Sequence, residues 1–219
     1  MVMKRLVVKL GLVGLALGTF GGVLSPTVAS AKSKPTFTKT DLKRYYKSAK
    51  SKSAFYFKTV KSGKKTGTIL ILGDFNGTSA NVKYGVPSSM KISKNGRTLT
   101  TKYKLMQFKT KNGKTTTSLG KTNYTFKLTK KSASKFSTKL SGNKTNRRLA
   151  TSGKTYTYSK VKASPAGSYS KKYVKPAMVK QQTKKYEGIG LADAQVKKIA
   201  TTYATTLSNT MVKNFNYKN

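Results

Sequence analysis

The chain has 219 residues and a formal net charge of +42, because 46 lysines and arginines face only four acidic residues. The absence of histidine and cysteine excludes the usual zinc and copper sites, Ser-His-Asp catalysis, cysteine nucleophiles and disulfides, and four carboxylates are too few for a calcium cage. We therefore expect a protein that is not an enzyme and holds no cofactor or metal.

Residues 1–31 have the pattern of a secretory signal. Lys4 and Arg5 form a basic start, residues 6–24 are mostly apolar, and Ala29 and Ala31 stand at the −3 and −1 positions of a signal-peptidase cleavage site. A retained membrane anchor is the alternative, but no stop-transfer pattern follows. An export signal without any cysteine is typical of a bacterial protein, so we expect secretion from a Gram-positive cell.

Residues 32–53 are predicted to hold a short helix and a polar connector. Thr40 and Asp41 provide residues that can cap a helix N-terminus. The apolar residues that follow have the spacing of one helical face, namely Leu42, Tyr45, Tyr46 and Ala49.

Residues 54–161 alternate between apolar and polar side chains, with Gly, Asn or Ser turns about every eight to twelve residues. This spacing predicts a mainly β fold, an antiparallel meander of about 8–10 strands that closes as a barrel or packs as a sandwich. Residues 68–72 are apolar on both faces, which is typical of a strand that is covered on both sides.

Two Asn-Gly pairs, Asn95-Gly96 and Asn112-Gly113, bracket one basic stretch of this meander. Asn-Gly favours tight type I′ turns, so the stretch is predicted to be one strand between two hairpin turns. Its alternation slips at Leu105-Met106, where we expect a bulge or the end of the strand.

Residues 162–190 combine two prolines, several glycines and a mixture of Lys, Tyr and Ser, which indicates a loose linker. Residues 191–214 are predicted to form a C-terminal helix. Asp193 lies in its first turn, where a negative charge is favourable, and Val196, Ala200, Tyr203 and Met211 belong to an apolar stripe.

Lysine dominates the basic residues, and a flexible ammonium group suits diffuse attraction to a polyanion better than readout of one sequence. For an exported protein we expect anionic wall polymers such as teichoic acids as partners, with the anionic membrane surface as a second candidate. The export signal argues against nucleic acid. The candidate contact residues on the strands are Lys102, Lys104, Lys109, Lys111, Lys127, Lys135 and Lys139.

Two other functions remain open. A barrel could carry a small ligand in a cavity lined by Ile71, Tyr84, Tyr124 and Phe126. Alternatively, the helix after Leu191 could act on membranes as part of a cationic protein.

The stretches LGTFGGVLSPTVASAKS and GKTYTYSKVK, within a body rich in Lys, Thr, Ser and Tyr, resemble small basic secreted proteins of lactobacilli. The Tyr- and Lys-rich composition is also similar to the wall-binding segments of lactobacillus S-layer proteins. This resemblance implies a secreted protein that associates with the wall. Residues 214–219 show no sortase signal, so we expect any such association to be non-covalent. The order of a strand meander and a C-terminal helix resembles lipocalin-like barrels, although the chain lacks the tryptophan of their Gly-x-Trp signature.

Overall fold

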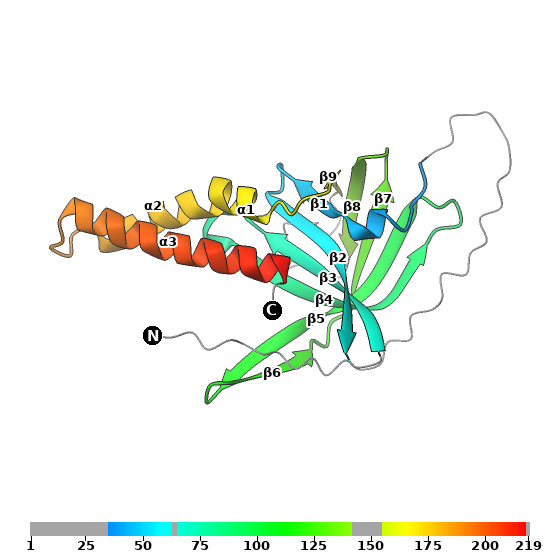
Figure 1. The fold of residues 1–219 in the computed structure, drawn as a ribbon, viewed down its shortest axis with the longest axis horizontal. Coiled ribbons are helices and arrows are strands. Elements are labelled where there is room, and N and C mark those ends of the chain that lie inside the picture. The colour runs from blue at the N-terminus through cyan, green and yellow to red at the C-terminus, as the bar shows by residue number, and fades with distance from the viewer. Residues whose placement is uncertain (1–34, 63–64, 142–154, 218–219) are drawn as a thin grey trace.

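A β-barrel with a long helical arm projecting from it makes up the described part of the chain (Figure 1). The computed structural model describes residues 35–62, 65–141 and 155–217, so the predicted signal segment with Ala29 and Ala31 lies outside it. Within these residues, no helix combines the length and the apolar character needed to cross a membrane.

Nine strands form one sheet in the described residues, in the order β4-β3-β2-β1-β9-β8-β7-β5-β6. An additional pairing of β4 with β5 closes eight of them into a barrel, and β6 pairs only with the outer part of β5. The strands are β1 (Tyr45–Ser48), β2 (Ser53–Ser62), β3 (Lys65–Asp74), β4 (Asn81–Ile92), β5 (Thr98–Lys111), β6 (Lys114–Leu119), β7 (Tyr124–Lys130), β8 (Lys135–Ser141) and β9 (Thr155–Val161). The prediction of a mainly antiparallel β fold is therefore confirmed, and of its two architectures the structure has the barrel.

The barrel interior is filled by aromatic side chains that come from alternate positions of the strands. The ring of Phe55 lies 4.8 Å from that of Tyr46 and 5.0 Å from those of Phe126 and Tyr158, and all four residues are fully buried. Eight strands enclose just enough space for side chains to fill. The interior is therefore a packed core, which we call the inner cluster.

A second, outer cluster lies between the outside of β2 and β3 and the helices that follow the barrel. Ile69 and Ile71 of β3 belong to it, whereas Leu70 and Leu72 belong to the inner cluster. Strand β3 is thus apolar on both faces because both faces are buried, as predicted. The helical elements are α1 (Ala166–Tyr169), the π-helical turn η3 (Ser170–Val174), α2 (Lys175–Tyr186) and α3 (Asp193–Asn216), after the short 3-10 turns η1 (Asp41–Lys43) and η2 (Gly77–Ser79).

Helix α3 confirms the predicted C-terminal helix. Its last turns pack on the barrel through Phe215, which is fully buried in the outer cluster. The rest of α3 packs along α2, and together they form the arm seen in Figure 1.

Two sequence expectations are corrected. The short N-terminal helix is reduced to the single turn η1, and Tyr45 and Tyr46 instead belong to β1. Strand β1 fills the place between β2 and β9, and the Tyr46 ring stacks on Phe55, so tertiary packing outweighs the helical spacing.

The expected loose linker over residues 162–190 is instead helical from Ala166 to Tyr186. Its prolines do not end this helical stretch: Pro165 is the N-cap of α1, and Pro176 is the second residue of α2, just after the π-helical turn η3. Proline is tolerated at the N-terminus of a helix because the first amide groups have no intrahelical acceptor. Within the continuous stretch, the π-helical turn before Pro176 accommodates the hydrogen bond that proline cannot donate.

The basic stretch between the Asn-Gly pairs is strand β5, which is continuous through the predicted irregularity at Leu105-Met106. Up to Leu105 the strand pairs within the barrel with β4 and β7, and from Met106 it pairs with β6 alone. The slip in the sequence pattern therefore marks the point where β5 leaves the barrel. The bulge lies in the neighbouring strand β4, between Pro87 and Ser89.

Candidate functional site

Five of the seven candidate lysines lie on the outer surface of the barrel. Residues Leu99, Thr101 and Tyr103 of β5 are buried inside, so the alternating positions of this strand face outward. By the same alternation β7 and β8 present lysines outward. We call this surface the lysine wall; its members are Lys91, Lys102, Lys104, Lys127, Lys135 and Lys139.

The register of the strands places lysines of the wall next to one another. Thr100 of β5 pairs with Lys91 of β4 on one side and with Lys127 of β7 on the other, and Lys127 in turn pairs with Lys139 of β8. Side chains directly opposite each other in an antiparallel pair are about 5 Å apart at Cβ, and like charges in such pairs are unfavourable. The wall therefore holds positive charge in an arrangement that folding alone does not favour.

Strands β4 to β9 carry no carboxylate side chain, since residues 75–186 contain no Asp or Glu. The four acids occupy other places. Asp41 is fully buried, Asp74 ends β3 and accepts the N–H of Asn76 at 2.9 Å, and Glu187 and Asp193 flank the loop at the end of the arm. The lysine wall thus carries no carboxylate to balance its lysines.

The other two candidate lysines, Lys109 and Lys111, lie on the opposite face of β5. They continue the side of the strand on which Leu105 and Gln107 stand, in the hairpin that β5 and β6 form outside the barrel. Lys111 pairs directly with Lys114 of β6, which makes a second pair of opposed lysines. We call Lys109, Lys111 and Lys114 the hairpin lysines.

The four residues expected to line an internal cavity lie on different sides of the barrel. Phe126 belongs to the inner cluster and Tyr124 packs against it. Ile71 and Tyr84 belong to the outer cluster, and the Tyr84 hydroxyl donates to the Asn214 carbonyl of α3 at 2.9 Å. These residues therefore do not surround one common space.

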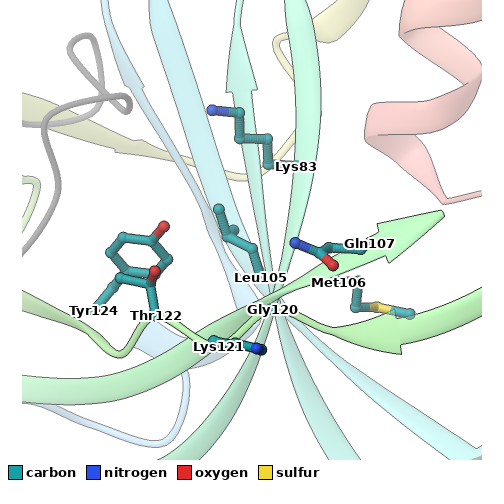
Figure 2. A pocket seen from close by; sticks show the side chains of 8 residues that line it. All are labelled: Lys83, Leu105, Met106, Gln107, Gly120, Lys121, Thr122 and Tyr124. Carbon is teal, nitrogen blue, oxygen red and sulfur yellow. The ribbon is translucent and has the colours of Figure 1, made fainter.

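A pocket of about 210 Å³ opens where β5 leaves the barrel, and Figure 2 shows the side chains around it. In this view Lys83 lies at the top with its amine directed away from the other residues, Lys121 lies at the bottom, and Tyr124 and Thr122 lie on the side opposite Gln107 and Met106. Its lining residues are Lys83, Leu105, Met106, Gln107, Gly120, Lys121, Thr122 and Tyr124.

The base of this pocket is part of the folded core. The ring of Tyr124 lies 5.4 Å from that of the fully buried Tyr103, and Leu105 packs against the inner cluster. The Gly120 N–H donates to the Leu105 carbonyl at 2.8 Å. A Cβ at position 120 would lie 3.3 Å from the Gln107 Nε2, so glycine leaves this side of the pocket open.

Sequence reasoning did not identify Lys83, Lys121 or Gln107 as site residues. The one available signal was the slip at Leu105-Met106, which marks where a strand departs and the barrel end opens. Nothing in the sequence alone indicates that Lys83 of β4 and Lys121 after β6 lie at one pocket, because closure of the barrel brings them together.

The described residues contain no group of three or more His, Cys, Asp or Glu side chains that could hold a metal ion. Asp74 at the end of β3 and Glu187 directly after α2 lie on the barrel and at the end of the arm, so they do not form such a group either. The charged groups gathered on the described surface are therefore lysines, which can hold anions.

Comparison with known proteins gave no match to a family model, to a curated protein or to a solved structure.

Proposed function

We propose that this is a secreted, non-enzymatic protein that binds anionic cell-wall polymers such as teichoic acids through its lysine wall. The observation that carries the proposal is the Lys127–Lys139 pair, two like charges held opposite each other on a surface without carboxylates. A bound polyanion would neutralise the two charges, whereas in the unbound protein their repulsion destabilises the fold.

The wall suits a long, flexible polyanion better than a ligand of fixed shape. Its lysines are spread over four neighbouring strands, and threonines such as Thr100 and Thr125 stand between them. Ammonium groups on flexible stems act as point charges, and binding gains free energy from the release of counterions. The affinity should therefore depend steeply on salt and weakly on the chemical repeat of the polymer.

Export supports the choice of polymer. The signal pattern of residues 1–31 directs the protein to a place where wall polymers are the abundant polyanions. The composition similar to S-layer wall-binding segments points the same way. We infer a location that is secreted or non-covalently associated with the wall of a Gram-positive bacterium.

Salt elution and a paired set of variants test the proposal. The variant Lys127→Gln/Lys139→Gln removes two charges from the wall, and the control Lys171→Gln/Lys172→Gln removes two exposed charges from η3. We expect the wall variant to elute from purified teichoic acid at lower salt than both the control and the native protein. Equal elution of the two variants, or retention that does not fall with salt, contradicts a role for the wall.

A second candidate function is contact with an anionic membrane, which the end of the arm favours. Ile189 is 56% exposed and Tyr203 46% exposed, and Leu191 and Ile199 are exposed nearby, with Lys197 and Lys198 on the same helix. Exposed apolar and basic side chains together are typical of interfacial binding. Ile189→Ser/Leu191→Ser would abolish binding to anionic vesicles in this case and leave teichoic acid binding unchanged.

A further inference from the structure

The pocket where β5 leaves the barrel has the chemistry of an anion site. Two amines, from Lys83 and Lys121, stand with the amide of Gln107 and the hydroxyls of Thr122 and Tyr124 among its eight lining residues, and none of the eight is a carboxylate. Lysine ammonium groups, an amide N–H and hydroxyls are all donors to anionic oxygens. A volume of about 210 Å³ is smaller than that of sites for drug-sized molecules, so it suits one small unit.

The hairpin lysines continue from this pocket. Leu105 and Gln107 at the pocket lie on the same side of β5 as Lys109 and Lys111, because alternate residues of a strand share a face. Successive side chains on this face are about 7 Å apart along the strand. The pocket is thus the barrel end of a line of basic residues that runs outward along the hairpin.

This line of basic residues also contains two lysines that lie directly opposite each other. Lys111 and Lys114 face each other at the hairpin turn, and Lys109 lies opposite Thr116. All three hairpin lysines are exposed. A single chain of phosphates that lay along this face would meet an amine at successive positions and reach Lys121 and Lys83 at the pocket.

We propose that the pocket binds one phosphate-bearing unit of an anionic polymer, while the hairpin lysines hold the units that follow it. This inference rests on the proposed function and adds a specific site to the diffuse attraction of the lysine wall. The apolar faces of Leu105 and Tyr124 at the base would contact the organic part of the unit, and the ammonium groups of Lys83 and Lys121, which stand at opposite ends of the pocket on flexible stems, would turn toward its phosphate oxygens.

Glycerol 1-phosphate is a suitable probe, because a single unit is too small to bridge the wall. Titration into the full ¹⁵N-labelled chain should shift the Gly120 amide and the Gln107 side-chain amide signals. Lys83→Gln/Lys121→Gln should weaken this binding about tenfold or more, and Lys127→Gln/Lys139→Gln, with the same loss of net charge, should leave it unchanged.

A variant without any change of charge separates pocket shape from electrostatics. In Gly120→Ala the new Cβ crowds Gln107, so binding of glycerol 1-phosphate should fall while the thermal unfolding midpoint confirms an intact fold. Equal weakening by the pocket and wall double variants, or no shift at Gly120 and Gln107, overturns the pocket site.

The same variants distinguish the two proposals. If poly(glycerol phosphate) binds through the lysine wall but the single unit does not bind at the pocket, the proposed function stands and this inference fails. If the polymer does not bind at all, both fail, even where the single unit still occupies the pocket.

Discussion

Asp41 is the one acidic side chain among the described residues that is fully buried, and two lysines share its carboxylate. The Nζ of Lys130 donates to its Oδ2 at 2.7 Å, and Lys160 donates to its Oδ1. The N–H of Thr38 also donates to Oδ2, at 2.9 Å, and Lys130 reaches the Thr36 carbonyl as well. Asp41 thus ties the segment before β1 to the ends of β7 and β9.

This arrangement predicts a fold that loses stability in acid. Burial alone would raise the pKa of Asp41, but the hydrogen bonds from Lys130, Lys160 and Thr38 outweigh it and lower the pKa below its ordinary value. Because the pKa of Asp41 is lower in the folded than in the unfolded state, the ionised carboxylate stabilises the fold at pH values above the unfolded-state pKa of about 4. This stabilisation is lost progressively as the pH falls from that value through the folded-state pKa. Urea unfolding at several pH values should show this loss.

Asp41→Asn should remove that acid dependence and lower the free energy of unfolding near neutral pH by about 3–5 kcal/mol, because the buried Lys130 ammonium and the partly exposed Lys160 ammonium lose their partner. Asp193→Asn is the control, since Asp193 is exposed in the first turn of α3. An Asp193→Asn protein that loses the acid dependence, or an Asp41→Asn protein that keeps it, would contradict this role.

For the opposed lysines of the wall, in contrast to Asp41, we expect the loss of a charge to stabilise the fold. Replacing Lys139 by Thr removes the like charge opposite Lys127 and places a residue with high β propensity on β8. At low salt we expect Lys139→Thr to raise the free energy of unfolding by up to about 1 kcal/mol and at the same time to weaken teichoic acid binding. A destabilised Lys139→Thr protein would show that Lys139 serves the fold and would argue against the functional interpretation of the pair.

At the scale of elements, the end of α3 is held by side chains of the barrel. The last carbonyl groups of a helix have no partner within it. Here three side chains of the barrel donate to backbone carbonyl groups at the end of α3. The Tyr56 hydroxyl donates to the Phe215 carbonyl at 2.8 Å and the Tyr84 hydroxyl to the Asn214 carbonyl. The Lys58 Nζ donates to the Tyr217 carbonyl at 2.9 Å. The barrel therefore provides the C-terminal cap of the arm.

Gly73 of β3 makes this docking possible, and its substitution should weaken it. A Cβ at position 73 would lie 2.6 Å from the Phe215 ring and 2.7 Å from that of Phe75, so one ring must move. Gly73→Ala should lower the free energy of unfolding by about 1–3 kcal/mol, and Phe215→Ala by about 3–5 kcal/mol. Tyr203→Ala, at an exposed position of α3, is the control for helix propensity.

Chemical denaturation measures these changes, and near-UV circular dichroism reports the aromatic packing. A Gly73→Ala protein as stable as the native one would mean that α3 can shift without loss, and the close fit at Gly73 would then have no energetic importance.

The elements differ in how far the sequence predicts them. Alternation in β5 and β7 identifies these strands, and Asn112 and Gly113 both have positive φ, as the predicted type I′ turn requires. At Asn95-Gly96 only Gly96 has positive φ, so the predicted type I′ turn is wrong there; the pair lies in a longer loop, in which the Asn95 Oδ1 accepts the Arg97 N–H. Local chemistry thus fixes the place of a turn more firmly than its type.

The positions of side chains relative to the core are harder to predict. β3 is apolar on both faces, so nothing in its pattern indicates that Leu70 and not Ile71 points inward. Likewise Lys104 and Lys109 fall on opposite faces of one strand, and only the pairing partners on each side show which face meets the wall. Closure of the barrel decides these points, and it depends on contacts far apart in the sequence.

At the scale of the whole molecule, the charge is distributed unevenly. The strands β4 to β9 and the helices up to Tyr186 contain only positive charge, and the acids lie before and after them. A polyanion approaching the barrel therefore meets attraction from the wall, the pocket and the hairpin lysines. The same charges repel one another within the folded protein.

This conflict predicts that salt acts in opposite directions on folding and on binding. The Debye length falls from about 30 Å at 0.01 M to about 3 Å at 1 M ionic strength, so added salt screens the repulsion among lysines such as Lys127 and Lys139. The free energy of unfolding should rise with sodium chloride, whereas the logarithm of the association constant for teichoic acid should fall linearly with the logarithm of the salt concentration. Urea titrations and elution at matched salt measure the two trends in one preparation. If stability also fell with salt, attraction would outweigh repulsion in the folded chain, and the lysine wall would not be a strained surface that a polyanion relieves.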